Sequence, residues 1–498
     1  MANNSDSNPT TWNTKIVCTL GPASTSEEVM ESMIVAGMDV CRLNFSHGTH
    51  EGHQEVFDRI RKLSKKYNEQ VAIVADIQGP KIRTGKMKEP FTLPQGAKIL
   101  VTPEKIMGTP ERIQIKYETL LEDLGVGDVI FINDGVVKLV VIQKLEKDLL
   151  CECEAAGDIN NHKGCNIPSG KLSVNVITEK DAKDLEFIAK LNPEYVAASF
   201  VGNGDDIHKV RNKLKEYGNT DIKIIAKMER PVALENLQEI IAASDCLMVA
   251  RGDLGVEIPA WDVPRWQKEM IYQCNKESKP VIVATQMMES MCHNSRPTRA
   301  EASDVYNAVL DGADAVMLSG ESSVGKYPVE AVKIMDEIVS VAQQHLPKRD
   351  PNDYDSSTQA VTETLAHAAF TIASEFKDIS YKGKIIVLTE SGRTARLISK
   401  YRPHLPILGF SANLRAVREL SLVWGVRAYY CPELEGLSIE EKAIRAIRVA
   451  QKIGYLDEEH KKVCVLAPSE FHGCGFFTGV YDVNKVLAAA KDKFGASK

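Results

Sequence analysis

The chain has 498 residues, 44% of them hydrophobic and 26% charged, and this composition excludes a disordered, collagen-like or low-complexity protein. Sixty-one lysines and arginines against 68 aspartates and glutamates give a net charge of -7, which argues against nucleic-acid binding through a general basic surface. The length is sufficient for roughly three domains.

The amino-terminal tail, residues 1–14, is polar and has neither the apolar core of a signal peptide nor the arginines of a transit peptide. No run approaches the ~18 apolar residues of a membrane span. The eleven cysteines are an odd number scattered along the chain, which favours reduced thiols over a disulfide framework. We therefore expect a cytoplasmic protein that binds neither membrane nor nucleic acid.

Short apolar runs rich in β-branched residues alternate with stretches of helical period, and this alternation predicts parallel strands. Segments 15–79 and 178–348 together approach the ~250 residues of a (β/α)8 TIM barrel, which is the α/β fold we predict for them. The expected barrel strands are 15–20, 39–45, 71–77, 195–201, 222–228, 246–252, 280–285 and 315–320, and the clearest helices are 27–36, 54–67, 179–191, 205–217, 266–278 and 328–343.

Residues 80–177 interrupt this alternation after the third strand. Short strands are expected at 98–102, 113–117, 129–132, 138–143 and 149–154, with Asn133-Asp134-Gly135 as a turn. We predict an inserted small β-barrel domain that acts as a lid.

The polar stretch 347–358 separates the barrel from the last part of the chain. Residues 358–498 again alternate strands with helices, and we predict a C-terminal α/β domain for effector binding and oligomerisation. Its expected strands are 385–388, 407–410, 427–431 and 463–467.

Polar residues gather where the expected barrel strands end, and the carboxyl ends of the strands are the catalytic face of this fold. Six of the eight ends carry them: Arg42 to His47, Asp76 to Arg83, Lys227 to Glu229, Arg251 to Asp253, Thr285 and Gln286, and Ser319 to Glu321. One such cluster is readily explained as a salt bridge on a solvated rim. Six together indicate a catalytic site.

The residue types in these clusters suit a metal ion and a multiply charged oxyanion. Glu229 and Asp253 are carboxylates without a nearby Cys or His, as Mg2+ prefers. Arg42 and Arg83 can grip phosphate oxygens, and Lys227 can offset negative charge on a group in transfer. Metal, cations and the lack of an evident covalent nucleophile are typical of phosphoryl transfer.

The residues closely resemble the pyruvate kinase family from about Lys15 to Lys493. The resemblance rests on several strings in the family's order: Cys41–Gly48 (CRLNFSHG), Asp76–Gly85 (DIQGPKIRTG), Met248–Pro259 (MVARGDLGVEIP), Ala284–Met287 (ATQM), Arg296–Val305 (RPTRAEASDV) and Met317–Glu321 (MLSGE). It implies Mg2+-dependent (or Mn2+-dependent) transfer of the phosphoryl group of phosphoenolpyruvate to ADP, giving pyruvate and ATP, the last step of glycolysis.

The resemblance also implies roles for individual residues. Arg42 would bind the phosphate of phosphoenolpyruvate, Lys227 would stabilise the transferring group, and Thr285 would support protonation of the enolate. Glu229 and Asp253 would hold Mg2+. Gly252, Asp253 and Thr285 would complete the substrate site, and the nucleotide would contact Asn44, Phe45, Ser46, His47, Arg83 and Lys180.

The family's potassium site corresponds to Asn44, Ser46, Asp76 and the backbone at Ile77. Members that need K+ usually carry Thr where Ile77 stands and Glu where Lys81 stands. An ammonium within ~4 Å of the substrate could replace the ion's attraction, worth about 1 to 4 kcal/mol. We therefore predict that activity is largely independent of K+.

Two further positions concern ligands. Gly52 replaces an aromatic residue common near the adenine, which weakens stacking and with it base specificity. The loop Thr389-Glu390-Ser391-Gly392-Arg393-Thr394 resembles the family's effector loop, although Glu390 is repulsive to phosphate. Residues 469–475 lack the Trp-Arg pair of fructose-bisphosphate-regulated members, so we expect a different phosphorylated effector.

Other readings stay open. Lys227 could be the Schiff-base lysine of a barrel aldolase, which borohydride trapping would reveal, and a barrel protein of the same fold with lost activity is a further alternative. Cys151, Cys153, His162 and Cys165 invite a zinc interpretation, but an ordinary strand and loop explain them better. The resemblance also implies a homotetramer.

Overall fold

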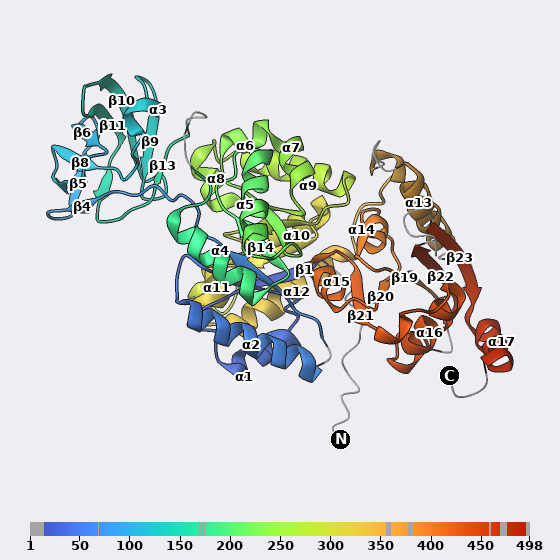
Figure 1. Cartoon of the computed structure of the whole chain (residues 1–498). Coiled ribbons are helices and arrows are strands. Elements are labelled where there is room, and N and C mark those ends of the chain that lie inside the picture. Colours follow the sequence, from blue (N-terminus) through green and yellow to red (C-terminus); the bar gives the residue numbers. More distant parts are fainter. Residues whose placement is uncertain are drawn as a thin grey trace.

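The computed structural model describes residues 14–67, 69–168, 172, 175–354, 360–376, 382–457, 460–468 and 476–494. The chain forms three parts, with a barrel in the middle, an inserted β-rich part on one side and a C-terminal α/β part on the other (Figure 1). Among the described residues, no helix is both long enough and apolar enough to cross a membrane.

Eight parallel strands close into a barrel in the order β1-β18-β17-β16-β15-β14-β3-β2, which confirms the predicted TIM barrel. Only β1 has the predicted bounds, and the other seven strands are shorter than predicted. Of these, β16 ends at Ala250 and β18 at Leu318 because helices α8 and α11 begin at Arg251 and Gly320. The strands are β1 (Lys15–Leu20), β2 (Val40–Asn44), β3 (Ala72–Asp76), β14 (Tyr195–Ala198), β15 (Lys223–Met228), β16 (Cys246–Ala250), β17 (Val281–Ala284) and β18 (Ala315–Leu318).

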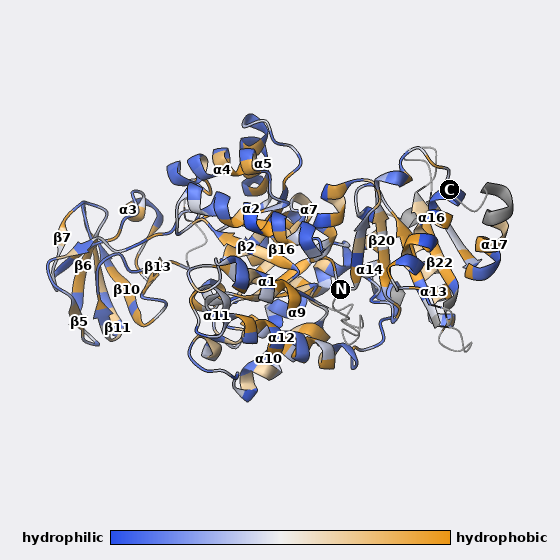
Figure 2. Cartoon of the chain, turned by 90° about the horizontal axis from the view of Figure 1, so that it is seen from below, coloured by the Kyte–Doolittle hydropathy of each residue, from blue (hydrophilic) through white to orange (hydrophobic). Residues whose placement is uncertain are grey.

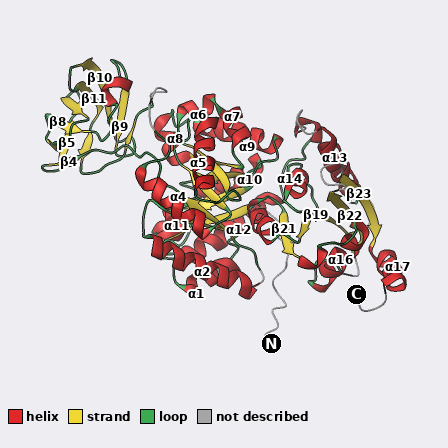
Figure 3. Cartoon of the chain, in the orientation of Figure 1, coloured by secondary structure: helices red, strands yellow, loops and turns green. Residues whose placement is uncertain are grey.

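Helices surround these strands (Figure 3). The predicted helices 179–191 and 328–343 have those bounds, whereas the helix expected from 54 begins four residues earlier, at His50. The barrel helices are α1 (Glu27–Val35), α2 (His50–Tyr67), α4 (Glu179–Leu191), α5 (Gly204–Glu216), α6 (Pro231–Glu235), α7 (Leu237–Ala243), α8 (Arg251–Glu257), α9 (Val263–Lys276), α10 (Arg299–Asp311), α11 (Gly320–Ser323) and α12 (Pro328–Gln343).

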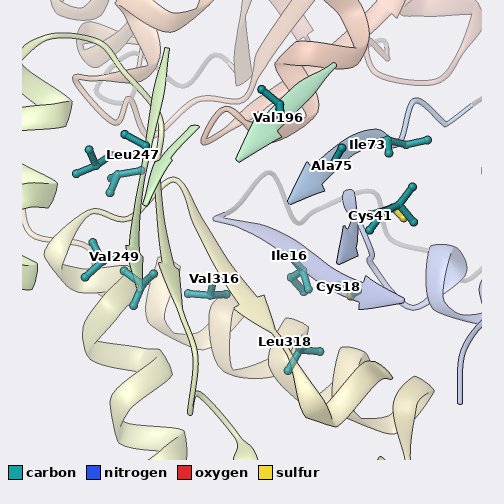
Figure 4. Close-up of a cluster of buried hydrophobic side chains, with 14 of the residues drawn as sticks. Ile16, Cys18, Cys41, Ile73, Ala75, Val196, Leu247, Val249, Val316 and Leu318 are labelled. Carbon is teal, nitrogen blue, oxygen red and sulfur yellow. The ribbon is translucent and has the colours of Figure 1, made fainter. Parts of the chain in front are cut away.

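Alternate residues of each barrel strand belong to two different cores, because successive side chains of a strand point to opposite faces. Ile16 and Cys18 pack outward in the large cluster shared with the helices (Figure 4), whereas Val17 belongs to the cluster that fills the barrel. This alternation sets which polar residues reach the barrel interior.

The insert lies between β3 and β14 and carries the five predicted strands. Its main sheet has six strands in the order β13-β9-β10-β11-β6-β8, and the isolated bridges Arg83–Gly164 and Thr84–Ile115 connect the residues next to its two end strands. The turn Asn133-Asp134-Gly135 has positive φ at all three residues, as a tight hairpin turn requires. The elements are β4 (Lys86–Met87), β5 (Phe91–Leu93), β6 (Lys98–Thr102), β7 (Met107–Gly108), β8 (Arg112–Gln114), α3 (Leu120–Asp123), β9 (Val129–Ile132), β10 (Val137–Lys144), β11 (Leu149–Ala155), β12 (Gly157–Ile159) and β13 (Cys165–Asn166).

The C-terminal part contains a five-stranded sheet in the order β21-β20-β19-β22-β23. Four of its strands match predicted ones, and the antiparallel edge strand β23 was missed because Gly479 interrupts its short apolar run. The elements are α13 (Ala360–Glu375), β19 (Lys382–Leu388), α14 (Arg393–Ser399), β20 (Ile407–Ser411), α15 (Leu414–Glu419), β21 (Val426–Tyr430), α16 (Ile439–Lys452), β22 (His460–Pro468), β23 (Phe476–Asp482) and α17 (Val483–Phe494).

The C-terminal part is joined to the amino-terminal end of the barrel by apolar and charged contacts. Leu422 is fully buried in the cluster that fills the barrel, alongside Tyr195. Arg402 forms an ion pair with Asp314 of the barrel at 3.1 Å, both side chains being buried.

Figure 2 shows hydrophobic residues concentrated in the strands β2, β16, β20 and β22.

Candidate active site

The barrel strands bring Arg42, Asp76 and Lys227 together. Each follows by two residues a member of the hydrophobic cluster that fills the barrel, namely Val40, Val74 and Ile225, respectively. Because side chains alternate along a strand, all three project inward near the carboxyl ends of β2, β3 and β15. Strand register sets Asn44 of β2 beside Asp76 of β3.

Asp76 is the centre of an ion-pair network. Its side chain is 1% exposed and pairs with Arg42 Nε at 2.6 Å and Lys227 Nζ at 3.3 Å. Lys227 also pairs with Glu229 at 2.8 Å, so one buried ammonium lies between two carboxylates. The two cations are thus held in fixed positions at the mouth of the barrel.

The pKa values of these groups keep them charged. Burial alone would raise the pKa of Asp76, but Lys227 and Arg42 outweigh it and lower the pKa below its usual value. Burial would lower the pKa of Lys227, but Asp76 and Glu229 outweigh it and raise the pKa. The site therefore presents permanent positive charge to a ligand.

Two hydroxyls that sequence reasoning missed complete this network. Ser199 Oγ accepts a hydrogen bond from Lys227 Nζ at 2.7 Å and donates to the Ile77 carbonyl at 2.8 Å. Thr19 Oγ1 accepts from Arg42 Nη1 at 2.9 Å. Thr19 lies in β1 and Ser199 directly follows β14, and the alternation of side chains along a strand could have placed both on the inner face. A Ser or Thr near a strand end does not by itself indicate a catalytic role.

Glu229 follows β15 and is buried, and its Oε2 accepts the backbone N–H of Phe200 at 2.7 Å. Burial, and in addition the charge of Asp253, raise the pKa of Glu229 above its usual value. The two carboxylates thus repel each other, and a divalent cation between them would remove that cost. Their oxygen donors fit Mg2+ or Mn2+.

The substrate positions Gly252 and Thr285 are hydrogen-bonded to each other. The N–H of Gly252, in the first turn of α8, donates to Thr285 Oγ1 at 2.7 Å. A side chain at Gly252 would lie 3.4 Å from that hydroxyl oxygen, so only glycine leaves the space open. Thr285 and Gln286 both have positive φ, a strained conformation that is typical of functional sites.

The nucleotide positions of the β2–α2 loop form a second group. Asn44 accepts the backbone N–H of Ser46, and Phe45 is buried and stacks on His53. Lys180 of α4 donates to the Phe45 carbonyl at 2.6 Å, which joins α4 to this loop, while His47 is exposed.

His50, at the start of α2, contacts side chains of α4. Its Nε2 lies 2.8 Å from the buried Asp184 carboxylate, and its ring stacks on Phe187 at 4.4 Å. Asp184 also pairs with Lys180 at 2.6 Å. The sequence missed this pair because it joins α2 to α4 across 134 residues.

Arg83 lies at the entrance to the insert and is attached to the segment that returns from it. Its guanidinium donates to the His162 carbonyl at 3.1 Å, and its backbone bridges Gly164. The predicted nucleotide residue Arg83 is therefore attached to both ends of the insert.

Lys81 is exposed, and a Cβ built on Gly164 would lie 3.6 Å from its Cε. The ion pairs found for Asp76 in the described part of the chain are those with Arg42 and Lys227. Another of the predicted potassium ligands, the backbone carbonyl of Ile77, accepts a hydrogen bond from the Ser199 hydroxyl.

The predicted effector loop, residues 389–394, lies between β19 and α14 and includes the first residues of α14. Gly392 has φ +77° and its N–H donates to the hydroxyl of the buried Thr389, while Glu390 and Ser391 are exposed. Thr389 and Glu390 line a cavity of about 600 Å3 together with Ser411, Asn413 and Lys442. Residues 469–475 lie outside the described residues.

The cysteines of the zinc reading are core residues. Cys151 and Cys165 are buried in the insert, and burial raises the pKa of each thiol to about 12. No group of three or more metal-ligating His, Cys, Asp or Glu side chains occurs among the residues that the structure describes.

Known proteins match along most of the chain. The family model for the pyruvate kinase barrel domain matches residues 11–332, and that for the pyruvate kinase alpha/beta domain matches residues 363–474. Pyruvate kinases of Staphylococcus aureus strains MRSA252 and USA300 are each 46% identical over 422 residues, covering 83% of this chain and 71% of theirs. A crystal structure of a pyruvate kinase from Cryptosporidium parvum matches with a TM-score of 0.87 and 34% identity, covering 95% of this chain and 96% of that one.

Proposed function

The chain belongs to the pyruvate kinase family and is a phosphotransferase, and from this premise we propose how its own residues transfer the phosphoryl group of phosphoenolpyruvate to ADP. The observation that carries the proposal is the buried network in which Asp76 and Glu229 hold Lys227, and Asp76 also holds Arg42. Cations fixed before the substrate arrives need no reorganisation during the reaction, which is how preorganised charge lowers a barrier.

Arg42 and Lys227 act on the phosphoryl group. The Arg42 guanidinium binds the phosphate oxygens of phosphoenolpyruvate. Its Nε donates to Asp76 and its Nη1 to Thr19, and these two bonds fix the orientation of the guanidinium toward the substrate. Lys227 neutralises the charge of the group as it moves to ADP.

Glu229 and Asp253 are the proposed ligands of Mg2+ or Mn2+. When bound, the divalent ion would offset charge on the phosphoryl and carboxylate oxygens. The raised pKa of Glu229, caused mainly by burial and in addition by the charge of Asp253, supports this assignment because a divalent cation would stabilise the buried carboxylate.

Gly252 and Thr285 hold the carboxylate end of the substrate. The N–H of Gly252 binds Thr285 in the structure, and we propose that a substrate carboxylate accepts this N–H instead. Thr285 then stands on the side from which the enolate is protonated and supports delivery of that proton, directly or through water.

The inserted domain brings the nucleotide site to the barrel. ADP contacts Asn44, Phe45, Ser46, His47 and Lys180 on the barrel, and Arg83 joins them as the insert closes and excludes water. We accordingly divide the chain into a tail (1–14), a catalytic barrel (15–79 and 178–348), a lid (80–177) and an effector and oligomerisation domain (358–498).

We also propose a phosphorylated effector at residues 389–394 and a homotetramer. Lys442 in the lining of the cavity beside Thr389 can bind a phosphate, whereas Glu390 and Glu435 in the same lining disfavour a strongly charged ligand.

Turnover of phosphoenolpyruvate and ADP with Mg2+, measured with and without K+ in buffers free of other monovalent metal ions, tests the function. Activity in both buffers supports the phosphotransferase and its independence of K+. Activity only with K+ keeps the function and refutes the role of Lys81. Absence of turnover in both, with and without sugar phosphates, contradicts the proposed function.

Lys81→Glu tests the K+ proposal from the opposite side. The variant replaces the ammonium by the residue usual in K+-requiring members, so we expect activity to become K+-dependent, with a loss of about tenfold in the K+-free buffer, equivalent to ~1.4 kcal/mol. Lys105→Glu makes the same charge change on an exposed residue of the insert and should leave K+ dependence unchanged. Equal behaviour of the two variants would refute the proposal.

A further inference from the structure

The inserted domain is hydrogen-bonded to the helix that carries Asp253. Asn166 of β13 donates from Nδ2 to Glu257 Oε1 of α8 at 3.0 Å, and the two residues are 8% and 9% exposed. The bond spans 91 residues, and β13 lies beside α8 in the fold (Figure 1). A buried hydrogen bond to a carboxylate is among the stronger single contacts between neutral and charged groups.

Other contacts make this a defined surface rather than an isolated bond. A Cβ built on Gly135, in the β9–β10 turn of the insert, would lie 3.4 Å from Val256 of α8. On the barrel side, the positive charge of the buried Arg230 interacts with Glu257. The second oxygen of Glu257 is buried without a hydrogen-bond partner among the described residues.

The Asn166 bond also connects the two halves of the proposed active site. Arg83, the nucleotide position of the insert, is bound to the His162 carbonyl and bridges Gly164, just before β13. Asp253 lies one helical turn before Glu257 in α8. The bond therefore fixes the segment that holds Arg83 against the helix that holds Asp253.

We propose that Glu257 and Asn166 are positioning residues: their hydrogen bond sets the nucleotide-binding insert relative to the metal-binding helix and so determines the affinity for ADP. The inference deepens the proposed function and rests on it. Without the bond, binding of ADP must itself order the insert against the barrel, and this ordering lowers affinity. Phosphoenolpyruvate contacts Gly252 of α8, but its phosphate binds Arg42 of β2, which the bond does not restrain, so its affinity is affected less than that of ADP.

An exchange of donor and acceptor tests the proposal. Asn166→Asp sets a second carboxylate against Glu257 and breaks the bond, and at pH 8 we expect a rise of about tenfold in the KM for ADP with the KM for phosphoenolpyruvate within about twofold. The double variant N166D/E257Q restores a bond of opposite polarity, in which the amide introduced in α8 donates to the carboxylate introduced in β13, and should recover most of the affinity. Because burial already raises the pKa of Glu257 and a second carboxylate raises it further, the single variant is measured from pH 7 to pH 9, where loss of a proton shared by the two carboxylates should increase its KM for ADP, whereas the double variant should show no such increase.

Two further measurements separate a positioning role from a structural one. Asn161→Asp makes the same change in the insert, where the side-chain oxygen only accepts from Met87, and should leave both KM values unchanged. Amide exchange in segment 251–257 should quicken in N166D and slow again in the double variant.

Failure of the double variant to recover, or an equal change of both KM values, would overturn the proposal. If the wild-type protein turns over no phosphoenolpyruvate, the proposed function fails, while the exchange measurement still decides whether the bond restrains α8.

Discussion

Asp76 is buried and pairs with both Arg42 and Lys227, and the three charges meet from different strands. Removing one member of such a group leaves a buried charge without its partner, which is costly in a poorly solvated site. Lys227 has two carboxylates and the Ser199 hydroxyl around it, so its position depends on all three.

Lys227→Met should lower turnover by about 10³-fold or more, because a preorganised charge at the transferring group is lost. Asp76 keeps its pair with Arg42, so we expect a folded protein whose binding of Mg2+ is little changed. Steady-state kinetics, thermal unfolding and Mn2+ binding followed by electron paramagnetic resonance check these expectations. Lys190→Met, which removes an exposed pair with Glu186, is the control. Turnover of K227M near that of the control would end the assigned role.

Glu257 should make stability depend on pH. Burial, offset in part by Asn166 and Arg230, raises its pKa to about 7, and Asp253 and Glu229 add to the rise. The folded state therefore binds a proton more tightly than the unfolded state, so stability falls as pH rises from about 4.5 to 7 and the full cost, about 3 kcal/mol, applies above pH 7.

Glu257→Gln removes this ionisation and keeps the oxygen that accepts from Asn166. We expect the variant to unfold at a higher temperature than the wild type at pH 8 and at a similar temperature at pH 4.5, with EDTA present to remove divalent ions. A variant that is equally or less stable at pH 8 would contradict the expectation.

At the scale of elements, α4 controls the entrance to the insert. Thr178 and Asp181 form a capping box at its start. Asp181 has a second contact, because its Oδ1 accepts the N–H of Gly79, just before the insert begins. The same carboxylate thus caps the helix and holds the backbone of Gly79.

Asp181→Ala should therefore lower the free energy of unfolding by more than the loss of a helix cap alone. We expect a decrease in the free energy of unfolding of about 2 to 4 kcal/mol, combining a cap of ~1 kcal/mol with the buried N–H of Gly79 left unpaired. Glu441→Ala removes the matching residue of the capping box of α16, at Ser438, and should cost only about 1 kcal/mol. Urea denaturation of both variants gives the comparison, and equal costs would show that the Gly79 contact contributes nothing.

At the scale of the whole molecule, the C-terminal domain is part of the barrel's own core. Leu422 is buried with Tyr195 in the cluster that fills the barrel, and Tyr195 Oη donates to the Glu419 carbonyl at 2.8 Å. The domain that carries the proposed effector site therefore contacts the end of the barrel opposite the active site.

Leu422→Ala should lower the free energy of unfolding by about 3 kcal/mol, because the shorter side chain leaves a cavity in the packed interior between the two domains. Calorimetry should also show a broader or divided transition as the domains lose their shared core. Leu145→Ala, at an exposed position of the insert, should change stability by less than about 0.5 kcal/mol. A similar small change for L422A would contradict the coupling of the two domains.

Local pattern in the sequence was enough to predict the barrel, the insertion after the third strand and the C-terminal α/β domain. The polar residues at the strand ends also predicted that Arg42, Asp76 and Lys227 lie at the carboxyl face of the barrel, where the structure brings them together. These are properties of neighbouring residues, which a single strand expresses without its partners.

The tertiary structure alone decided which of these groups meet. That Asp76 pairs with both cations, that Ser199 binds Lys227, that His50 pairs with Asp184 and that Asn166 reaches Glu257 depend on strand register, barrel closure and the direction of the insert. Each contact joins residues far apart in the chain. Its geometry is set by packing of whole elements and is not encoded in any local period.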